Sequence, residues 1–298
     1  MKEINLTVIG DLTCSTTRVY LEYLRCHNLR PRNLWLMRFL PKSSLARRAE
    51  SFGALRIAHW LHSRQSTVLF SHHDRFVRLC DRLQREAATL QVKLFGDFGF
   101  HEYASNVVEL TAEGYGDPWF QNQIKSHKDT AFLYTNGGIV PEDLLAEPGL
   151  KIIHVHPGVV PQFRGSDALI WSYLLTGRIG ASCFFMSPGI DEGRLLKAAN
   201  FSVPSLTPLQ DYLGAVDEDL AYRALLFAVD PHMRAQLLCK VLSEFKGDDL
   251  REISSTKQPK TNWAPFLWMH PKLRSVALNS LSSARSADKK MTLISVVS

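Results

Sequence analysis

The stretch KIIHVHPGVVPQFRGSDALIW, residues 151–171, indicates the fold class of this chain. It opens with a short apolar run that contains His154 and His156, and Pro157 and Gly158 end the run. In a β-strand residues i and i+2 point to the same face, so both imidazoles should project together at the carboxyl end of this strand. Open parallel sheets bind their ligands at that edge. We therefore expect a functional site here.

Segments typical of strands and helices alternate on both sides of this stretch. We expect strands at 5–11, 33–39, 92–98, 130–138, 151–157 and 181–189. We expect helices at 15–29, 46–62, 73–90, 141–146 and 167–177, a partly helical segment at 99–126, and mostly helix at 208–245. Ser15 or Thr16 would cap the first helix, and Gly177 would stop the one before the last strand. Alternation of this kind predicts an α/β protein with a mostly parallel, twisted sheet.

The pattern changes after the last predicted strand. We expect residues 1–205 to form the first domain and residues 206–298 to form a mainly helical C-terminal region with a polar tail. Within that region, STKQPKTN at residues 255–262 has the composition of a linker.

Composition excludes several classes of protein. Of 298 residues, 45% are hydrophobic and 21% are charged, which is typical of a folded globular chain. There is no apolar run long enough to span a bilayer and no signal-peptide core, so we expect a cytoplasmic protein without a membrane partner. The five cysteines are scattered, which predicts neither disulfides nor a cysteine zinc site. The net charge of +6 could indicate a nucleic-acid surface or a pocket for an anionic substrate, but the basic residues are spread along the chain. We therefore expect a basic surface that is simply solvated and no nucleic-acid partner.

A carboxylate should join the two histidines. The segment MSPGIDEG, residues 186–193, ends a predicted strand and presents Asp191 and Glu192 on a turn. Two imidazoles and a carboxylate also match a zinc or iron site, and a pair of histidines can simply be buried in a core. Asp191 could likewise be no more than a turn-forming residue.

Two segments together resemble the 10-formyltetrahydrofolate-dependent formyltransferase family, which includes glycinamide ribonucleotide, methionyl-tRNA and sugar-nucleotide enzymes. These are HVHPGVVPQFRGSDALIWSYLLTG at 154–177 and GASCFFMSPGIDEG at 180–193. The family signature is Asn-x-His-Pro, then a proline and a basic residue before glycine, then an Asp-x-Gly turn. Here the corresponding residues are His154 to Pro157, Pro161, Arg164 with Gly165, and Asp191 to Gly193. His154 replaces the family asparagine.

The resemblance implies a Rossmann-like formyltransferase fold and a catalytic set of His154, His156 and Asp191, with no metal. His156 and His154 would stabilise the oxyanion, and Asp191 would orient His156 and handle protons. Because a neutral imidazole keeps one N–H, His154 could replace the amide donor of asparagine. The resemblance places the folate against two loops, formed by Asn136, Gly137, Gly138 and Ile139, and by Met186, Ser187, Pro188, Gly189 and Ile190.

The implied activity is N-formylation of the amine of a small substrate, for which an anionic molecule is left open, with 10-formyltetrahydrofolate as the co-substrate. A nucleotide-linked amino sugar is the preferred acceptor, and an amino-acid-derived amine comes next. The family often holds a substrate phosphate at the first strand–helix turn, here residues 10–17, although Asp11 disfavours an anion there. A methionyl-tRNA enzyme would need a C-terminal β-barrel, which the helical pattern disfavours. A homodimer is left open. Two alternatives remain, a noncatalytic or repurposed formyltransferase-like binding protein and a metal-dependent hydrolase that uses the His-x-His pair.

Overall fold

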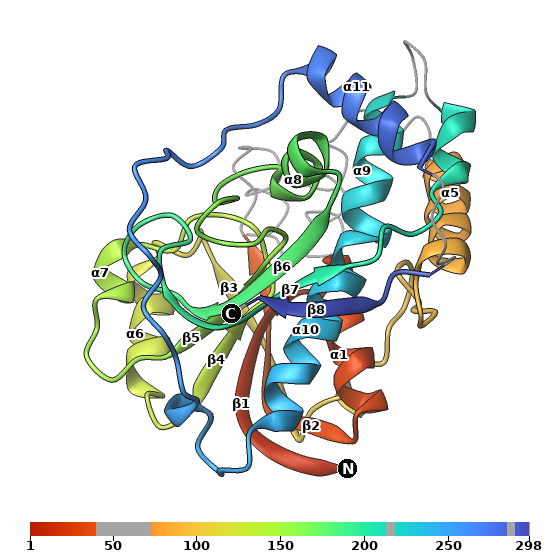
Figure 1. Cartoon of the computed structure of the whole chain (residues 1–298). Coiled ribbons are helices and arrows are strands. Elements are labelled where there is room, and N and C mark those ends of the chain that lie inside the picture. Colours follow the sequence, from red (N-terminus) through yellow and green to blue (C-terminus); the bar gives the residue numbers. More distant parts are fainter. Residues whose placement is uncertain (40–72, 213–217, 285–289, 298) are drawn as a thin grey trace.

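Eight strands form one sheet in the order β3-β2-β1-β4-β5-β6-β7-β8 (Figure 1). The computed structural model describes residues 1–39, 73–212, 218–284 and 290–297. The strands are β1 Lys2–Asp11, β2 Leu29–Phe39, β3 Asn106–Ala112, β4 Ala131–Tyr134, β5 Ile152–His156, β6 Ile179–Phe185, β7 Arg194–Phe201 and β8 Leu293–Val297. Strands β1 to β5 pair in parallel, whereas β6, β7 and β8 add antiparallel pairings at one end. The predicted α/β class with a mostly parallel sheet is confirmed.

Helices cover both faces of the sheet. They are α1 Ser15–Cys26, α5 His73–Ala87, α6 Pro118–Ser126, α7 Glu142–Leu145, α8 Ala168–Thr176, α9 Glu218–Ala228, α10 Asp230–Glu244 and α11 Pro271–Ser282, with short 3₁₀ turns at Phe100–Glu102, Thr207–Tyr212 and Leu250–Glu252. Helices α1, α5, α9 and α10 pack over one large apolar cluster, and α6 and α7 pack over a smaller one on the other face (Figure 1). Because both faces are covered, β4 in the middle of the sheet is continuously apolar and entirely buried.

The first helix differs from its prediction at both ends. The N-cap is Cys14, which makes no side-chain capping bond, while Ser15 and Thr16 are buried inside the first turn. The helix ends at Cys26 and not at residue 29, because β2 begins at Leu29, four residues earlier than expected. By contrast, α8 stops at Gly177 in the left-handed conformation (φ 67°), as predicted.

The predicted strand at 92–98 is wrong. Val92 and Leu94 are buried in alternation, but the backbone of Val92 bonds to the side chain of Gln84 instead of to a neighbouring strand. Gly96 then turns the chain with a φ of 70°. The strand that pairs with β2 is β3, within a segment for which only partial helix was expected.

The C-terminal region supplies two helices of the main layer and one strand of the sheet. Helices α9 and α10 fall in the predicted helical region, and α10 packs against α1 and β6. Strand β7, which was not predicted, pairs with β6, and β8 in the predicted polar tail pairs with β7. The division at residue 205 stays a prediction. The helix expected at 46–62 lies outside the described residues.

All five cysteines are free, as the sequence indicated. Among the residues that the model describes, no helix has both the length and the apolar character needed to cross a membrane.

Candidate functional site

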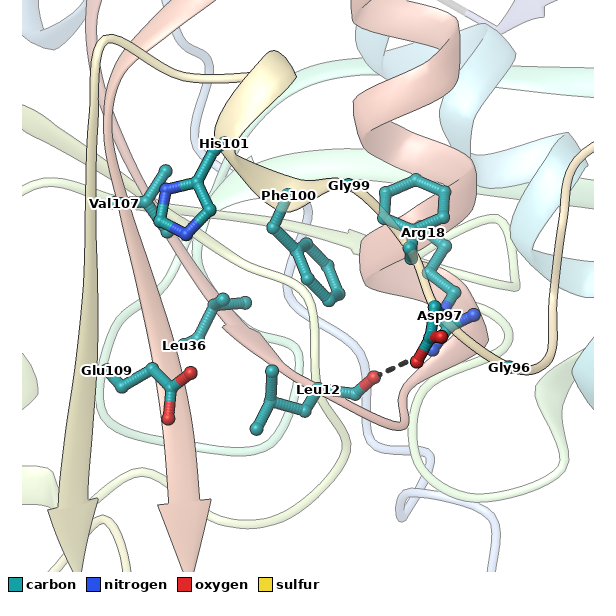
Figure 2. Close-up of a pocket in the computed structure, with 11 residues that line it drawn as sticks. Leu12, Arg18, Leu36, Gly96, Asp97, Gly99, Phe100, His101, Val107 and Glu109 are labelled. Carbon is teal, nitrogen blue, oxygen red and sulfur yellow. Dashed lines mark hydrogen bonds between the residues drawn. The ribbon is translucent and has the colours of Figure 1, made fainter.

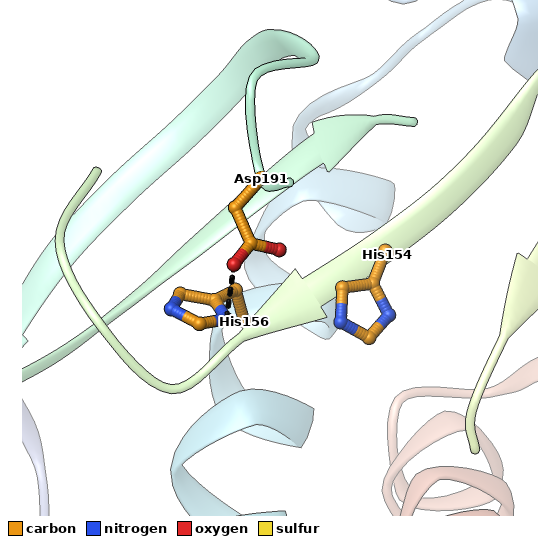
Figure 3. Close-up of side chains that lie close together, drawn as sticks. All are labelled: His154, His156 and Asp191. Carbon is orange, nitrogen blue, oxygen red and sulfur yellow. Dashed lines mark ion pairs between the residues drawn. The ribbon is translucent and has the colours of Figure 1, made fainter. Parts of the chain in front are cut away.

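The fold brings His154, His156 and Asp191 together, as the sequence predicted (Figure 3). Both histidines lie on β5 and point to the same face, and Asp191 lies in the connection between β6 and β7. One ligand atom from each of the three side chains lies within 4.8 Å of the other two.

Each ring nitrogen of His156 has one partner. Its Nε2 lies 2.7 Å from the carbonyl oxygen of Phe163, and its Nδ1 lies 3.4 Å from Oδ2 of Asp191. A carbonyl oxygen only accepts, so Nε2 carries a proton, and Nδ1 faces the carboxylate. The side chain is only 4% exposed, so the surrounding chain encloses it at the end of the strand. The His156 ring is therefore packed in the interior, with its orientation fixed by two contacts.

Asp191 links two loops that are distant in the sequence. Its Oδ2 accepts a hydrogen bond of 2.8 Å from the backbone N–H of Gly165, in the connection after β5. The same oxygen faces His156. Asp191 has a φ of 55°, in the left-handed region that few residues other than glycine adopt. This backbone conformation indicates that the surrounding contacts fix the turn.

His154 is neutral and offers a lone pair. Burial lowers its pKa to about 4, although the Asp191 carboxylate acts in the opposite direction. Its Nδ1 lies 3.2 Å from the carbonyl oxygen of Tyr134, so Nδ1 carries the proton and donates it there. Nε2 is then an acceptor. This tautomer corrects the expectation of a free N–H at His154 in place of the family asparagine.

An ion pair beneath β5 was missed by sequence reasoning. Arg234 of α10 pairs with Asp230 at 2.5 Å, donates to Oγ1 of Thr16 at 3.1 Å, and reaches the carbonyl of Val155 at 3.4 Å. Burial raises the pKa of Asp230, and the adjacent guanidinium opposes that shift. The pair therefore stabilises Val155, which lies between the two histidines, from the face of the sheet that α10 covers. A charged pair four residues apart in an apolar helix was the available signal.

The first predicted folate loop follows β4. Asn136 is buried and donates to the hydroxyl of Tyr115 at 2.7 Å, while Ile139 is 83% exposed. Gly138 has a φ of 114°, and a Cβ added to Gly137 would meet no atom within 4 Å. Open space beside this backbone is what a flat ring needs for close approach.

The second predicted folate loop follows β6. Met186 donates its N–H to the carbonyl of Ile152 at 2.7 Å and packs against the smaller apolar cluster. Gly189 has a φ of 96°, and Ile190 is 53% exposed. Each loop thus offers an exposed isoleucine beside a glycine turn, and these groups fit a planar, largely apolar ligand. Ser187 and Pro188 complete the loop.

A pocket of about 370 Å³ lies beside the turn between β1 and α1 (Figure 2). Arg18 lines it and donates to the carbonyls of Leu12 at 3.1 Å and Lys93 at 3.3 Å. Burial lowers the pKa of this guanidinium. In the turn itself, the carboxylate of Asp11 accepts from both the N–H and the hydroxyl of Thr13. That carboxylate occupies donors that a phosphate at residues 10–17 would need.

A C-terminal segment also reaches the site. The backbone of Phe266 pairs with Gly165, and a Cβ on Gly165 would meet the carbonyl oxygen of Phe266 at 2.2 Å. The buried side chain of Arg164 pairs with Glu192 and donates to the carbonyl of Trp263 at 2.6 Å. Sequence patterns gave no signal for this contact, because Trp263 and Phe266 follow the linker-like residues 255–262 in a C-terminus without a clear helix or strand pattern.

Comparison with known proteins identifies the family of this chain. The family model described as formyl transferase matches residues 63–217, more than half of the chain. The chain therefore belongs to the formyl transferase family.

The chain is also similar to several individual proteins. The methionyl-tRNA formyltransferase of Syntrophus aciditrophicus is 31% identical over 122 residues, which make up 39% of this chain and 39% of that protein. The chain thus matches well under half of that relative's length. A phosphoribosylglycinamide formyltransferase from Anaplasma phagocytophilum has a TM-score of 0.44 at 14% identity, covering 88% of this chain and 97% of that one. A sugar N-formyltransferase from a Shewanella species has a TM-score of 0.41 at 10% identity, covering 97% and 96%.

Proposed function

We propose that this protein transfers a formyl group from 10-formyltetrahydrofolate to the amine of a small substrate. One observation supports this most strongly: Asp191 bonds to the Gly165 amide and faces Nδ1 of His156, beside a neutral His154. The bound folate would supply the activated formyl carbon, and the two glycine-containing loops would hold its ring. The chain's own residues then have to orient the amine, accept its proton and stabilise negative charge.

His154 orients the amine. Its Nε2 lone pair accepts a hydrogen bond from an N–H of the neutral amine and directs the nitrogen lone pair towards the formyl carbon. Because the pKa of His154 is about 4, the ring stays neutral near pH 7 and keeps this lone pair available. A base with so low a pKa is a poor final proton acceptor, so another group must take the proton.

The Asp191–His156 pair accepts that proton. As the new C–N bond forms, the amine loses a proton to Nδ1 of His156, directly or through water, and the carboxylate of Asp191 stabilises the resulting imidazolium. The bond between the formyl carbon and N10 of the folate then breaks, N10 takes the proton back from His156, and tetrahydrofolate leaves. The new positive charge lies within the same cluster and stabilises the negative charge on the formyl oxygen. Burial strengthens both effects, because few solvent dipoles screen them.

For the acceptor we propose a nucleotide-linked amino sugar, formylated in the cytoplasm. The net charge of +6 favours an anionic substrate.

The test is an assay with 10-formyltetrahydrofolate and a panel of amino-sugar nucleotides and amino-acid-derived amines, read by mass spectrometry. We expect a product that carries one added formyl group. Folate binding without turnover on any amine would support a noncatalytic binding protein instead.

A metal-dependent hydrolase is the second candidate, because the three donor groups lie within 4.8 Å of one another. To bind a metal ion, His156 or Asp191 would have to give up one of its present contacts, and the ion would take that position. Metal analysis of the purified protein distinguishes the two candidates. Stoichiometric zinc or iron that is lost together with activity in His154→Asn would support the hydrolase.

A further inference from the structure

The segment of residues 253–270, here called the strap, crosses the outside of both loops that carry the catalytic groups. It runs from the last 3₁₀ turn to α11 and is drawn in blue in Figure 1. Its first part pairs with the chain after Asp191 through a bridge between Thr256 and Leu195. Its later part pairs with the chain after His156, where Phe266 bonds to Arg164 and Ser166. The strap therefore links the two loops from outside.

Gln258 makes the most direct contact between the strap and the site. Its Nε2 amide donates to the backbone carbonyl of Asp191 at 2.9 Å and to that of Gly193 at 2.7 Å. One side-chain amide thus holds two carbonyls of the same turn. The side chain is partly buried, so these bonds are partly shielded from water.

The turn that Gln258 holds is one with little freedom to relax. Asp191 has a left-handed backbone, and the chain beside Gly193 is so close that a Cβ there would lie 1.8 Å from the carbonyl oxygen of Phe185. Within this turn, Oδ2 of Asp191 must reach both the Gly165 amide and Nδ1 of His156. A small rotation of the turn would break both contacts.

We propose that Gln258 is a positioning residue that holds Asp191 against His156. The strap is then a working part of the active site, although its composition is that of a linker. The effect of Gln258 on the rate rests on the proposed formyl transfer. The effect of Gln258 on the geometry of Asp191 does not depend on that activity, and the experiments below measure the two effects separately.

Gln258→Met keeps the length of the side chain and removes both donated hydrogen bonds. The matched control is Lys257→Met, since Lys257 is the exposed neighbour on the same strap. We expect kcat of Gln258→Met to fall about 10- to 100-fold, as displacement of a catalytic group by about 1 Å does, with each KM changed by less than about twofold. Lys257→Met should match the parent. Equal losses in the two variants would overturn the specific role of Gln258.

Gln258→Glu tests the donor itself. A carboxylate cannot donate to two carbonyls, whereas the protonated acid can donate to one. The ratio of its kcat to that of the parent should therefore rise as the pH falls from about 8 to 5, towards the ordinary titration range of glutamate. A ratio that does not change with pH would contradict the proposal. This measurement decides the question even if Gln258→Met folds poorly.

A readout independent of activity is the ¹⁵N signal of the His156 ring. Asp191→Asn gives the reference for a lost carboxylate contact, and the signal of Gln258→Met should move from the parent value towards that reference. A ring signal identical to that of the parent would overturn the positioning role. If the parent protein transfers no formyl group, the proposed function fails, but the ring signal still tests Gln258.

Discussion

At the scale of single residues, the carboxylate of Asp191 has two separable tasks. It accepts a hydrogen bond from the Gly165 amide, which shapes the turn, and it places negative charge beside Nδ1 of His156. The first task needs only an oxygen acceptor, whereas the second needs the charge.

Asp191→Asn should separate these tasks. The amide oxygen can still accept from Gly165, so the fold and the folate dissociation constant should change little. The rate should fall by more than about tenfold, because the imidazolium formed in the transition state loses its counter-charge. Steady-state kinetics and a folate titration check this. An unchanged kcat would leave Asp191 as a turn-forming residue only.

His154 should tolerate asparagine and not alanine. A side-chain amide can still accept a hydrogen bond from the amine, so His154→Asn should keep measurable transfer, while His154→Ala should lose about 100-fold or more per folded molecule. Because the pKa of His154 is about 4, the ring gains a proton only as the pH falls towards 4. The pH–rate profiles of the parent and His154→Asn should therefore coincide from pH 5 to 7. A step near pH 6.5 seen only in the parent would contradict this assignment.

At the scale of elements, the connection between β5 and α8 determines how His156 is held. Gly158 lies in this connection, and a Cβ at that position would meet the carbonyl oxygen of Phe163 at 2.5 Å and Cβ of Ala168 at 2.9 Å. That carbonyl is the acceptor for Nε2 of His156. The glycine is therefore needed for both packing and site geometry.

Gly158→Ala should reduce stability and activity together. Overpacking against the backbone should cost about 1–3 kcal/mol of unfolding free energy, and displacement of the Phe163 carbonyl should lower kcat. Gly177→Ala is the control, because its Cβ would meet nothing within 4 Å and only the left-handed φ is unfavourable. That variant should lose about 1 kcal/mol and keep its specific activity. Urea unfolding and kinetics on both variants check the pair. Normal activity in Gly158→Ala would contradict the argument.

At the scale of the whole molecule, a buried polar network joins three helices. His232 of α10 is 0% exposed and contacts the hydroxyl of Tyr23 in α1 and the amide oxygen of Gln84 in α5, each at 3.2 Å. Burial lowers the pKa of His232 to about 3, and Lys290 acts in the same direction. The folded protein thus holds this ring neutral well below its ordinary range.

Stability should therefore decrease in acid. Below pH 6.5 the unfolded chain protonates His232 while the folded chain does not until about pH 3, so unfolding becomes easier as the pH falls. Between pH 6.5 and 4.5 this should remove about 2–3 kcal/mol. His232→Gln, which does not titrate, should lose about 1–2 kcal/mol at pH 7 and show a shallower pH dependence. Urea unfolding of the parent and of His232→Gln between pH 6.5 and 4.5 checks this prediction. An equal change of unfolding free energy with pH in the two proteins would contradict it.

The sequence by itself determined the features that depend on short-range patterns. Alternation with a period of two placed His154 and His156 on one face, and the change between strand and helix periods gave the α/β class. Gly177 marked a helix end because few other residues adopt a positive φ there. The family signature brought Asp191 to the same site, and the geometry agrees.

The tertiary structure decided what depends on partners that are distant in the chain. Residues 92–98 alternate like a strand, but Gln84 takes the backbone bonds of Val92, so no ladder forms. The Tyr134 carbonyl fixes the tautomer of His154, which no local pattern encodes. Gln258 lies in a linker-like segment and meets Asp191 across 67 positions. The hydrophobic period and the composition of a segment depend on residues that are close in the sequence. These contacts join residues that are distant in the sequence, so they form only when the sheet has assembled.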